Sequence, residues 1–366
     1  MTTILTFLAA LALVAPKDGA TVPTLKEAQK AYFAGTRDER HLRMGDPSDR
    51  VRLAAVGATQ RPLELAWTAD ETNALFVLKV VREGGALEVF SVTNRAKVYL
   101  TNLELGARYH WSVFDGRDTA AASFVTEPDA PRFLYAGGVS NFRDLGGWRT
   151  ADGRRVRENR IFRSAGLRFS SRMEGGSFFT KKVVTGARHV TDAGLATLRD
   201  DFGIRTELDL RTPQETAGMT STLLGPHVRW VREPFVAYDV IDSFSRGKEP
   251  FGRILRLLAD EASYPVLAHC AGGRDRVGTL AFLLNGLLGV SEEDLCRDWE
   301  ASIFSDSGEK FEPTLLRRLL DCLKGFPGET LQARIEAYAK SCGVTDDELA
   351  AFRRLMLETS DGGADS

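Results

Sequence analysis

Only one of the four cysteines in the chain is followed by an arginine six positions later. These two residues are Cys270 and Arg276, and the stretch between them contains Gly272 and Gly273. A cysteine thiolate is a strong nucleophile, and a guanidinium group can bind two oxygens of a tetrahedral anion at once. Together they predict phosphoryl transfer through a cysteinyl-phosphate intermediate.

The residues on either side of this pair predict the elements that position it. Residues 265–268 form a short apolar run typical of a buried strand, and residues 277–288 are typical of a helix. A loop between such elements leaves the first helical N–H groups without partners, and the helix dipole adds partial positive charge there. We expect this cage of amides to favour the thiolate of Cys270 and to bind the phosphoryl oxygens. The predicted phosphate-binding residues are Ala271, Gly272, Gly273, Arg274, Val277 and Gly278.

The stretch H-C-A-G-G-R-D-R-V-G-T at 269–279 resembles the signature loop of the cysteine-dependent protein tyrosine phosphatase superfamily. It is most similar to a bacterial branch whose loop reads H-C-x-A-G-K-D-R-T-G and whose members act on phosphotyrosine or phosphoinositides. The resemblance covers residues 131–357 and implies that Cys270 is the nucleophile and Arg276 the phosphate clamp. Similar segments occur in the same order in that branch, namely N-F-R-D-L-G-G at 141–147, F-R-S-A at 162–165 and D-L-R at 209–211.

Two positions of the loop depart from that branch. Relatives have Thr or Ser after the arginine, and its hydroxyl helps the thiolate to leave the phosphoenzyme. This chain has Val277 there, and Thr279 is not expected to reach, so slow hydrolysis of the intermediate is predicted. Arg274 replaces a lysine, which keeps the charge but changes the geometry of anion contact. Arg274 either widens the positive field for a second phosphate or faces solvent.

The reaction also needs an acid that protonates the leaving oxygen. Asp275 lies inside the loop, and the resemblance implies this role for it. Alternatively, Asp275 orients Arg274 or a loop amide. Asp239 and Asp242 are rival acids, because they follow the strand predicted at residues 228–231 on a loop that could close over the site.

Five further side chains are predicted to support the site. His269 is expected to be a structural hydrogen-bond partner that helps to hold the thiolate. Arg143 and Asp144 are expected to pair near the end of the sheet rather than to contact substrate. Arg163 and Arg211 are candidates for positive charge at the mouth of the site. The histidines and the other cysteines lack the spacing of metal ligands, so we predict an enzyme without a metal or another cofactor.

The chain has 366 residues, which is enough for two domains with separate cores. Its formal net charge of −2 implies neither a nucleic acid nor an acidic membrane as a partner. Residues 131–358 alternate strand and helix patterns, which predicts an α/β catalytic domain with a central, mainly parallel sheet flanked by helices. Prolines within residues 126–132 indicate the domain boundary, and residues 359–366 are expected to be a disordered tail.

Two segments of the catalytic domain carry predictions of their own. Residues 212–215 read T-P-Q-E, a capping box with proline at the first helical position, which predicts a helix. Residues 168–189 form a long insertion with paired glycines, which we interpret as a candidate lid.

Residues 21–128 are predicted to form an all-β sandwich domain that precedes the catalytic domain. The pattern L-x-L-G-x-x-Y at 103–109 is similar to the segment that places the tyrosine corner of fibronectin type III and immunoglobulin-like domains. The charged stretch 37–52 is expected to be a solvated connector. No residue of this domain predicts chemistry, so we interpret it as a spacer or docking module, the alternative being a carbohydrate- or protein-binding site. Strands are expected at residues 63–67, 74–81, 87–92 and 108–114.

Residues 4–14 form an apolar run that is too short to span a bilayer. It is typical of the apolar region of a secretory signal, so residues 1–20 are predicted to be a signal peptide and the protein to be secreted or periplasmic. The alternative is a buried N-terminal strand or helix in a cytoplasmic protein. In either case we expect no membrane span in the mature chain.

These observations predict a tyrosine phosphatase-like phosphomonoesterase that acts on a phosphorylated protein or a phosphoinositide. Because of Val277, a catalytically weak module that traps phosphate is an alternative. A phytase-like inositol polyphosphate phosphatase shares the loop but would need more basic residues around the mouth. A sulfurtransferase also uses a loop cysteine, although Arg276 suits a phosphate better.

Overall fold

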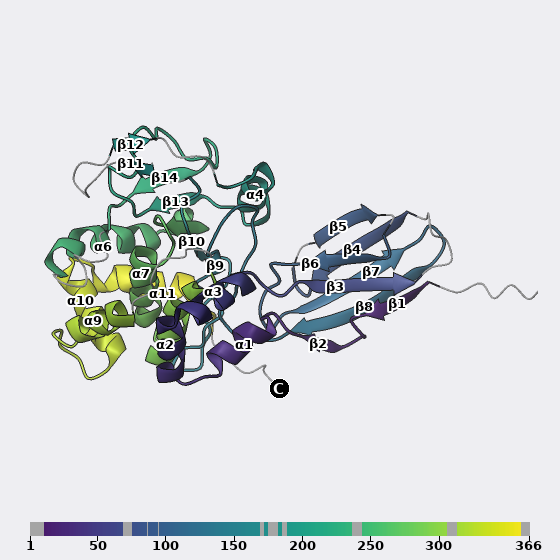
Figure 1. The fold of residues 1–366 in the computed structure, drawn as a ribbon, viewed down its shortest axis with the longest axis horizontal. Coiled ribbons are helices and arrows are strands. Elements are labelled where there is room, and N and C mark those ends of the chain that lie inside the picture. The colour runs from purple at the N-terminus through teal and green to yellow at the C-terminus, as the bar shows by residue number, and fades with distance from the viewer. Residues whose placement is uncertain are drawn as a thin grey trace, which may run out of the picture. The chain divides into compact units, whose positions relative to one another are not determined.

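The computed structural model describes residues 11–68, 75–85, 87–93, 95–168, 172–174, 182–184, 189–235, 244–305 and 313–359. The chain forms two compact units. One comprises residues 1–26 and 60–130, and the other comprises residues 27–59 and 131–366. The elements of both units are labelled in Figure 1.

The first unit contains two β-sheets that share one hydrophobic core. Leu65 and Trp67 from one sheet lie in the same buried cluster as Leu78, Trp111 and Phe124 from the other. The predicted strands are therefore present. The smaller sheet has the order β1 (Ala12–Ala15), β3 (Leu63–Thr68), β6 (Lys97–Leu100). The larger has the order β2 (Ala20–Val22), β8 (Thr119–Thr126), β7 (Arg108–Phe114), β4 (Phe76–Arg82), β5 (Leu87–Thr93).

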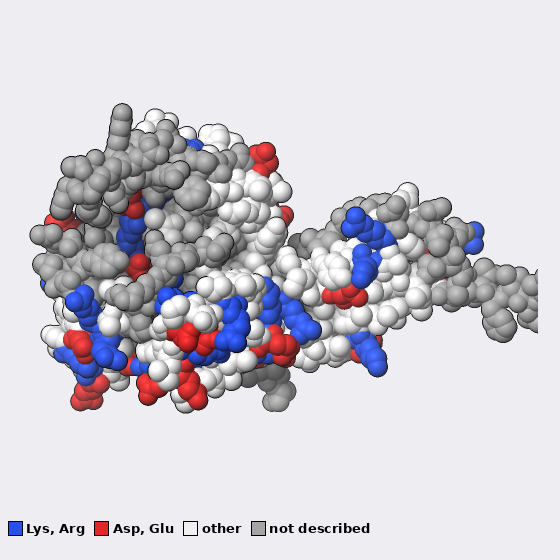
Figure 2. All heavy atoms as spheres, in the orientation of Figure 1, with Lys and Arg blue, Asp and Glu red and all other residues white. Residues whose placement is uncertain are grey.

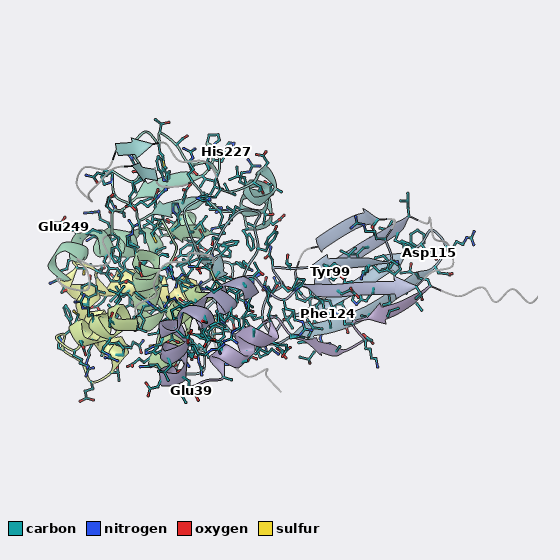
Figure 3. The ribbon with its side chains drawn as sticks, viewed as in Figure 1. Glu39, Tyr99, Asp115, Phe124, His227 and Glu249 are labelled. Atoms are coloured by element: carbon teal, nitrogen blue, oxygen red, sulfur yellow. The ribbon has the colours of Figure 1, made fainter. Side chains whose placement is uncertain are left out.

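Tyr109 makes the hydrogen bond that the sequence pattern at 103–109 predicts. Its hydroxyl oxygen accepts a bond of 2.9 Å from the backbone N–H of Glu104. The Tyr109 ring stacks on Phe124, which is labelled in Figure 3, with 5.2 Å between the ring centroids. A tyrosine hydroxyl that bonds to the backbone a few residues upstream is the defining feature of a tyrosine corner.

The segment predicted to be a signal peptide includes ordered structure. Residues 12–15 form strand β1, in which Ala12 and Leu13 lie opposite Thr68 and Trp67 of β3. Residues 1–10 lie outside the described residues. A cleavage after residue 20 would therefore remove a strand of the smaller sheet.

The prediction that residues 37–52 are a solvated connector is wrong. They form most of α2 (Arg37–Gly45) and α3 (Pro47–Val56), which follow α1 (Glu27–Phe33). A capping box of Thr36 and Glu39, the latter labelled in Figure 3, begins α2. All three helices belong to the second unit, so the structure does not keep residues 21–128 together as one domain. The prediction failed because the sequence alone does not distinguish an arginine that is buried against a carboxylate from one that forms an ion pair at the surface.

The second unit is built on a mainly parallel five-stranded sheet, as predicted. Its order is β14 (Arg229–Arg232), β13 (Thr206–Asp209), β15 (Val266–His269), β10 (Ile161–Ser164), β9 (Arg143–Asp144). Only the edge strand β9 is antiparallel to its neighbour. The parallel strands end at one edge of the sheet, which is where such sheets bind ligands.

Helices cover both faces of this sheet (Figure 1). Helix α7 (Asp275–Leu287) packs on β10 and β15. Phe162 and Leu267 point to the opposite face, because successive side chains of a strand alternate. There they join a core with Leu195 and Leu198, which belong to α4 (Asp192–Ala196) and the following π-helix η1 (Thr197–Asp201).

The second unit contains seven further helical elements among the described residues. They are α6 (Phe244–Leu258), the short 3-10 helix η2 (Glu261–Ser263), α8 (Glu292–Glu300) with the 3-10 turn η3 (Ala301–Phe304), α9 (Pro313–Leu323), α10 (Leu331–Ser341) and α11 (Asp346–Met356). α8 and α10 contact α7 directly.

No helix among the described residues is long and apolar enough to cross a membrane. On the face shown in Figure 2, basic and acidic side chains are intermixed rather than separated by sign.

Two segments of the second unit differ from prediction or are only partly described. Residues 213–218 form a hydrogen-bonded turn instead of a helix, although both bonds of the predicted capping box between Thr212 and Glu215 are present. Within the candidate lid, β11 (Arg172–Glu174) pairs with β12 (Lys182–Val184). Residues 169–171, 175–181, 185–188 and 360–366 lie outside the described residues, which includes most of the predicted tail.

Candidate active site

The loop between β15 and α7 has the order that the sequence predicts. Cys270 directly follows the strand, is a free cysteine and is only 3% exposed. Ala271 and Gly272 are exposed, and α7 begins at Asp275. Gly273 has a φ of +69°, and a Cβ at this position would lie 2.6 Å from the backbone nitrogen of Ala165. The turn therefore needs glycine at 273 both for its backbone conformation and for its approach to the end of β10.

The carbonyl groups of this loop are bound from behind by the protein. The Gly166 N–H donates to Ala271 O at 3.1 Å, and Asn141 Nδ2 donates to Gly273 O at 2.7 Å. Arg163 donates to Gly273 O at 3.0 Å and to Arg274 O at 3.3 Å. Since each peptide group has its N–H opposite its C=O, these bonds turn the amides towards the open side of the loop.

Arg276 is fixed by a bidentate ion pair with Glu215. Its two terminal nitrogens donate to the two Glu215 oxygens at 2.6 and 2.7 Å. Burial by itself would lower the pKa of Arg276, but the bond to Glu215 and the negative charges of Cys270 and Glu215 raise it. Glu215 was not among the predicted site residues, although the T-P-Q-E pattern fixed its local geometry.

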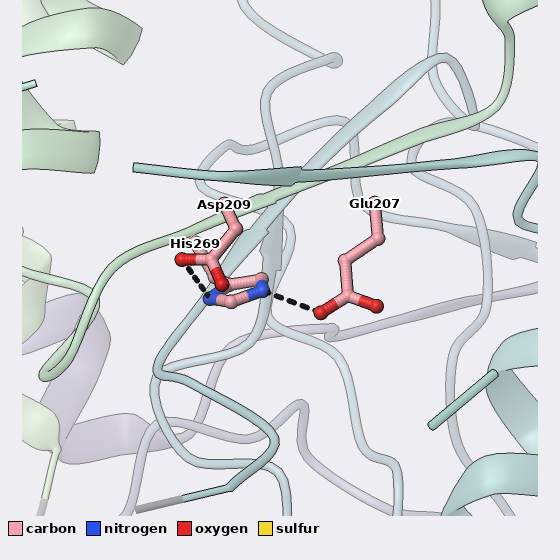
Figure 4. Close-up of side chains that lie close together, drawn as sticks. All are labelled: Glu207, Asp209 and His269. Atoms are coloured by element: carbon pink, nitrogen blue, oxygen red, sulfur yellow. Dashed lines mark hydrogen bonds and ion pairs between the residues drawn. The ribbon is translucent and has the colours of Figure 1, made fainter. Parts of the chain in front are cut away.

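His269 lies between two buried carboxylates, as Figure 4 shows. Its Nε2 is 2.8 Å from Glu207 Oε1, and its Nδ1 is 3.8 Å from Asp209 Oδ1. Burial disfavours the charged ring, but Asp209 and Glu207 outweigh it and raise the pKa of His269 above 6.5. The residue before Cys270 therefore favours an imidazolium. Glu207 was missed from the sequence, although period-two alternation places it on the same face as Asp209.

The same three residues could hold a metal ion by distance alone, because their ligand atoms lie within 4.8 Å of one another. Their hydrogen bonds already use these atoms, however. Both oxygens of Asp209 accept bonds from Arg211, at 2.8 and 2.7 Å, and Glu207 also accepts a bond from Thr222. A metal would have to displace a completed network, so the donor set fits hydrogen bonding better.

Two arginines predicted at the mouth of the site are placed elsewhere. Arg211 is 2% exposed, and Asp209 neutralises it through a pair of 2.7 Å. Arg163 is fully buried behind the loop and pairs with Asp298. The prediction of open positive charge is wrong for both, because each guanidinium is buried and paired with a carboxylate. The partner of Arg163 is distant in sequence, and that of Arg211 is only two residues away, so neither pair could be recognised from the sequence.

Arg143 and Asp144 do not pair with each other. Adjacent residues of β9 point to opposite faces of the sheet. Arg143 bonds to Asp298 Oδ1 at 3.3 Å and to the side chain of Asn141, whereas Asp144 bonds to Arg132 at 2.9 Å. Burial and the neighbouring charge of Arg163 lower the pKa of Arg143 to about 9.

Three further predicted residues lie along the loop and the first turn of α7. Arg274 and Asp275 are half-buried, and Asp275 is the first residue of the helix. Val277 is buried and brings no hydroxyl to the loop. The Thr279 hydroxyl is buried without a hydrogen-bond partner among the described residues. The rival acids Asp239 and Asp242 lie outside the described residues.

The chain belongs to the tyrosine phosphatase family, because a model of that family matches residues 134–177 and 185–358. A Cupriavidus necator protein named as a tyrosine-protein phosphatase is 28% identical over 204 residues. That match spans 50% of this chain and 66% of the relative, just under two thirds of its length.

A similarity to a solved structure is weaker. The core catalytic domain of the PP-IP phosphatase SIW14 of S. cerevisiae, solved with citrate, is 14% identical. The match covers 44% of this chain and 78% of that domain with a TM-score of 0.28. At this score the likeness carries no weight for the fold or the substrate.

Proposed function

We propose that the protein hydrolyses phosphotyrosine esters, and phosphoinositide esters as a second substrate class, through a cysteinyl-phosphate on Cys270. The observation that carries the proposal is the loop from 270 to 276. A buried thiol lies at its start, its carbonyl groups are bonded away from the open side, and Arg276 is fixed at its end. These are the parts that a phosphoryl group with three charged oxygens requires.

In this mechanism the Cys270 sulfur attacks phosphorus, and the bond from phosphorus to the leaving oxygen breaks. Arg276 and the loop amides bind the three phosphoryl oxygens, and Asp275 donates a proton to the leaving oxygen. Water then attacks the phosphocysteine and gives a proton to Asp275. The sulfur leaves as a thiolate, and inorganic phosphate is released.

The nucleophile is tested by Cys270→Ser with an aryl phosphate as substrate. We expect kcat to fall at least about a thousandfold, because the alcohol is a far weaker nucleophile at neutral pH. Cys296→Ser is the matched control: Cys296 is buried in α8, and its pKa is raised to about 12, chiefly by burial. Equal activity of Cys270→Ser and the parent would rule the proposal out.

The acid is tested by comparing Asp275→Asn, Asp239→Asn and Asp242→Asn on a good and a poor leaving group. A true acid variant loses rate selectively on the poor leaving group, because that oxygen needs the proton most. A selective loss only in Asp239→Asn or Asp242→Asn would remove Asp275 from the role.

A second candidate, a module that traps phosphate with little turnover, is favoured by one observation. Val277 has no hydroxyl to assist the leaving thiolate, and its side chain is buried. We expect Val277→Thr to speed hydrolysis of the intermediate several-fold and to shrink any initial burst of product. An unchanged burst and steady-state rate would mean that residue 277 does not limit turnover.

The substrate is identified with a panel of phosphotyrosine and phosphoserine peptides, phosphoinositides and phytate.

Two proposals concern the rest of the chain. The first unit is a sandwich of the fibronectin type III or immunoglobulin type, supported by its two sheets with one core and by the Tyr109 bond. It serves as a spacer or docking module.

The second proposal is that the protein is exported to the periplasm or outside the cell. It rests on the apolar run at residues 4–14 alone, and fractionation of cells that express the full chain tests it.

A further inference from the structure

We propose that the N-terminal helical segment, residues 27–59, is a positioning element for the phosphate-binding loop and acts through α8 and η3. The inference rests on the proposed function of that loop. The family model begins at residue 134, so this segment lies outside the matched region. It nevertheless belongs to the same compact unit as the loop.

The segment grips one side of α8–η3 through a buried ion pair. Arg40 and Glu300 are both fully buried, and Arg40 Nε donates to Glu300. His41 Nε2 lies 2.9 Å from the other Glu300 oxygen, and Arg40 also donates to Glu293 at 2.7 Å. A buried carboxylate that loses such partners is left without compensation, so this contact fixes where Glu300 can lie.

Apolar packing holds the same two parts of the chain together. Helix α3 contacts η3, and the rings of Tyr32 and Phe33 lie 5.4 and 5.9 Å from the ring of Phe304. A close-packed contact of this kind transmits a displacement instead of absorbing it. The position of α8–η3 is therefore set by both charge and shape.

The other side of α8–η3 holds the groups that bind the loop from behind. Asp298 accepts bonds from Arg163 at 2.5 Å and from Arg143 at 3.3 Å. The Ser302 hydroxyl oxygen accepts bonds of 3.2 Å from Arg143 and from Asn141. Residues 298 and 302 are one helical turn apart and share a face, whereas Glu300 lies between them and points away towards Arg40.

The chain of contacts ends on the loop itself. Arg163 and Asn141 both donate to Gly273 O, at 3.0 and 2.7 Å, and these bonds turn the loop amides outwards. Because every link is buried, a shift of α8–η3 must move the loop carbonyl groups. We infer that Arg40, which lies outside the loop, positions the phosphate-binding amides through these contacts.

Arg40→Met tests this inference, because methionine keeps much of the side-chain length and removes the charge. We expect inhibition by inorganic phosphate to weaken and kcat/KM on an aryl phosphate to fall about tenfold to a hundredfold, as small misplacements of a site do. The matched control is Arg37→Met. Arg37 is on the same helix and pairs with Glu292 and Glu293 but not with Glu300. It should leave both readouts unchanged.

The double variant Arg40→Met, Glu300→Met covers the case in which Arg40→Met does not fold. It removes both charges together, which proteins tolerate better than one unpaired buried charge. We expect it to fold and to keep the weakened phosphate inhibition. Folded variants with the parent's phosphate inhibition and kcat/KM, even at reduced thermal stability, would overturn the inference and leave a purely structural role.

Failure of the inference can be told from failure of the proposed function. If the parent protein neither turns over an aryl phosphate nor is inhibited by inorganic phosphate, the proposed function of the loop fails. If the parent does both and Arg40→Met matches it, only the positioning role fails.

Discussion

The phosphate-binding loop is held by two arginine–carboxylate assemblies that differ in exposure and in task. At its open side, Arg276 is half-buried and pairs with Glu215. Behind it, Arg163 and Arg143 are fully buried and share Asp298. In the proposed mechanism the front assembly presents a cation to the substrate, whereas the arginines of the rear assembly donate hydrogen bonds to backbone carbonyl groups. The same residue types thus serve binding on one side and positioning on the other.

The largest effect should follow from changing the front guanidinium. Arg276→Lys keeps the charge but loses the two-pronged geometry towards both Glu215 and the phosphoryl oxygens. We expect kcat/KM on an aryl phosphate to fall about a hundredfold or more, with little change in the free energy of unfolding. Steady-state kinetics and a denaturant titration measure the two quantities. A large loss of stability with normal kinetics would show that Arg276 and Glu215 stabilise the fold and do not bind the substrate.

The rear assembly should respond in the opposite way. Asp298→Asn leaves two buried guanidinium groups without a compensating charge, so the free energy of unfolding should fall by about 3 kcal/mol or more. Asp294→Asn, on the same helix, is the control. Asp294 pairs with Arg297 at the surface, and its loss should cost no more than about 1 kcal/mol. Equal costs for the two variants would show that the rear pair is no more buried in solution than a surface pair.

A smaller effect is expected at the carboxylate of the front pair. Burial would raise the pKa of Glu215, but its bond to Arg276 lowers it, so Glu215 is ionised at neutral pH. Glu215→Gln removes that charge and lets the guanidinium turn. We expect inhibition by inorganic phosphate to weaken about tenfold, the equivalent of one charge-assisted hydrogen bond. Unchanged inhibition would mean that the loop alone orients Arg276.

The smallest effect should be a pH dependence beside Cys270. His269 faces Glu207, Asp209 and Arg211, and its pKa in the folded protein is raised above 6.5. The raised value stabilises the fold fully below pH 6.5, and this contribution is lost as the pH rises through the folded-state pKa. Glu207→Gln should therefore cost most stability at low pH, and its difference from the parent should shrink as the pH rises. Denaturant titrations across that range measure the difference, and a constant difference would contradict a charged His269.

The residues around the loop differ in how far the sequence could predict them. The strand, the loop and helix α7 follow from a continuous stretch, so the sequence predicts correctly that Cys270 follows the strand and that Arg276 lies at the start of the helix. Local sequence patterns gave wrong predictions where contacts between distant residues determine the structure. The T-P-Q-E stretch predicted a helix, yet residues 213–218 form a turn, and Glu215 within this turn pairs with Arg276. Asp298 gave no signal, because its partner Arg163 lies 135 positions away.

The helices of residues 37–52 were missed for a related reason. A charged stretch reads as solvated unless its partner is known, and the partner of Arg40 lies 260 positions away at Glu300. A capping box at Thr36 and Glu39 was the available sequence signal for a helix there. The alternation of side chains along β13 predicts that Glu207 and Asp209 share a face of the sheet, but it does not predict that His269 contacts Glu207.

The most direct test of the account is the site of covalent phosphorylation during turnover. The protein is mixed with an aryl phosphate, quenched within the first turnovers under conditions that preserve phosphocysteine, and mapped by peptide mass spectrometry. The account predicts one phosphoryl group on the peptide that contains Cys270, longer-lived in the parent than in Val277→Thr. A phosphoryl group on another residue, or full activity with none on Cys270 at any quench time, would contradict it.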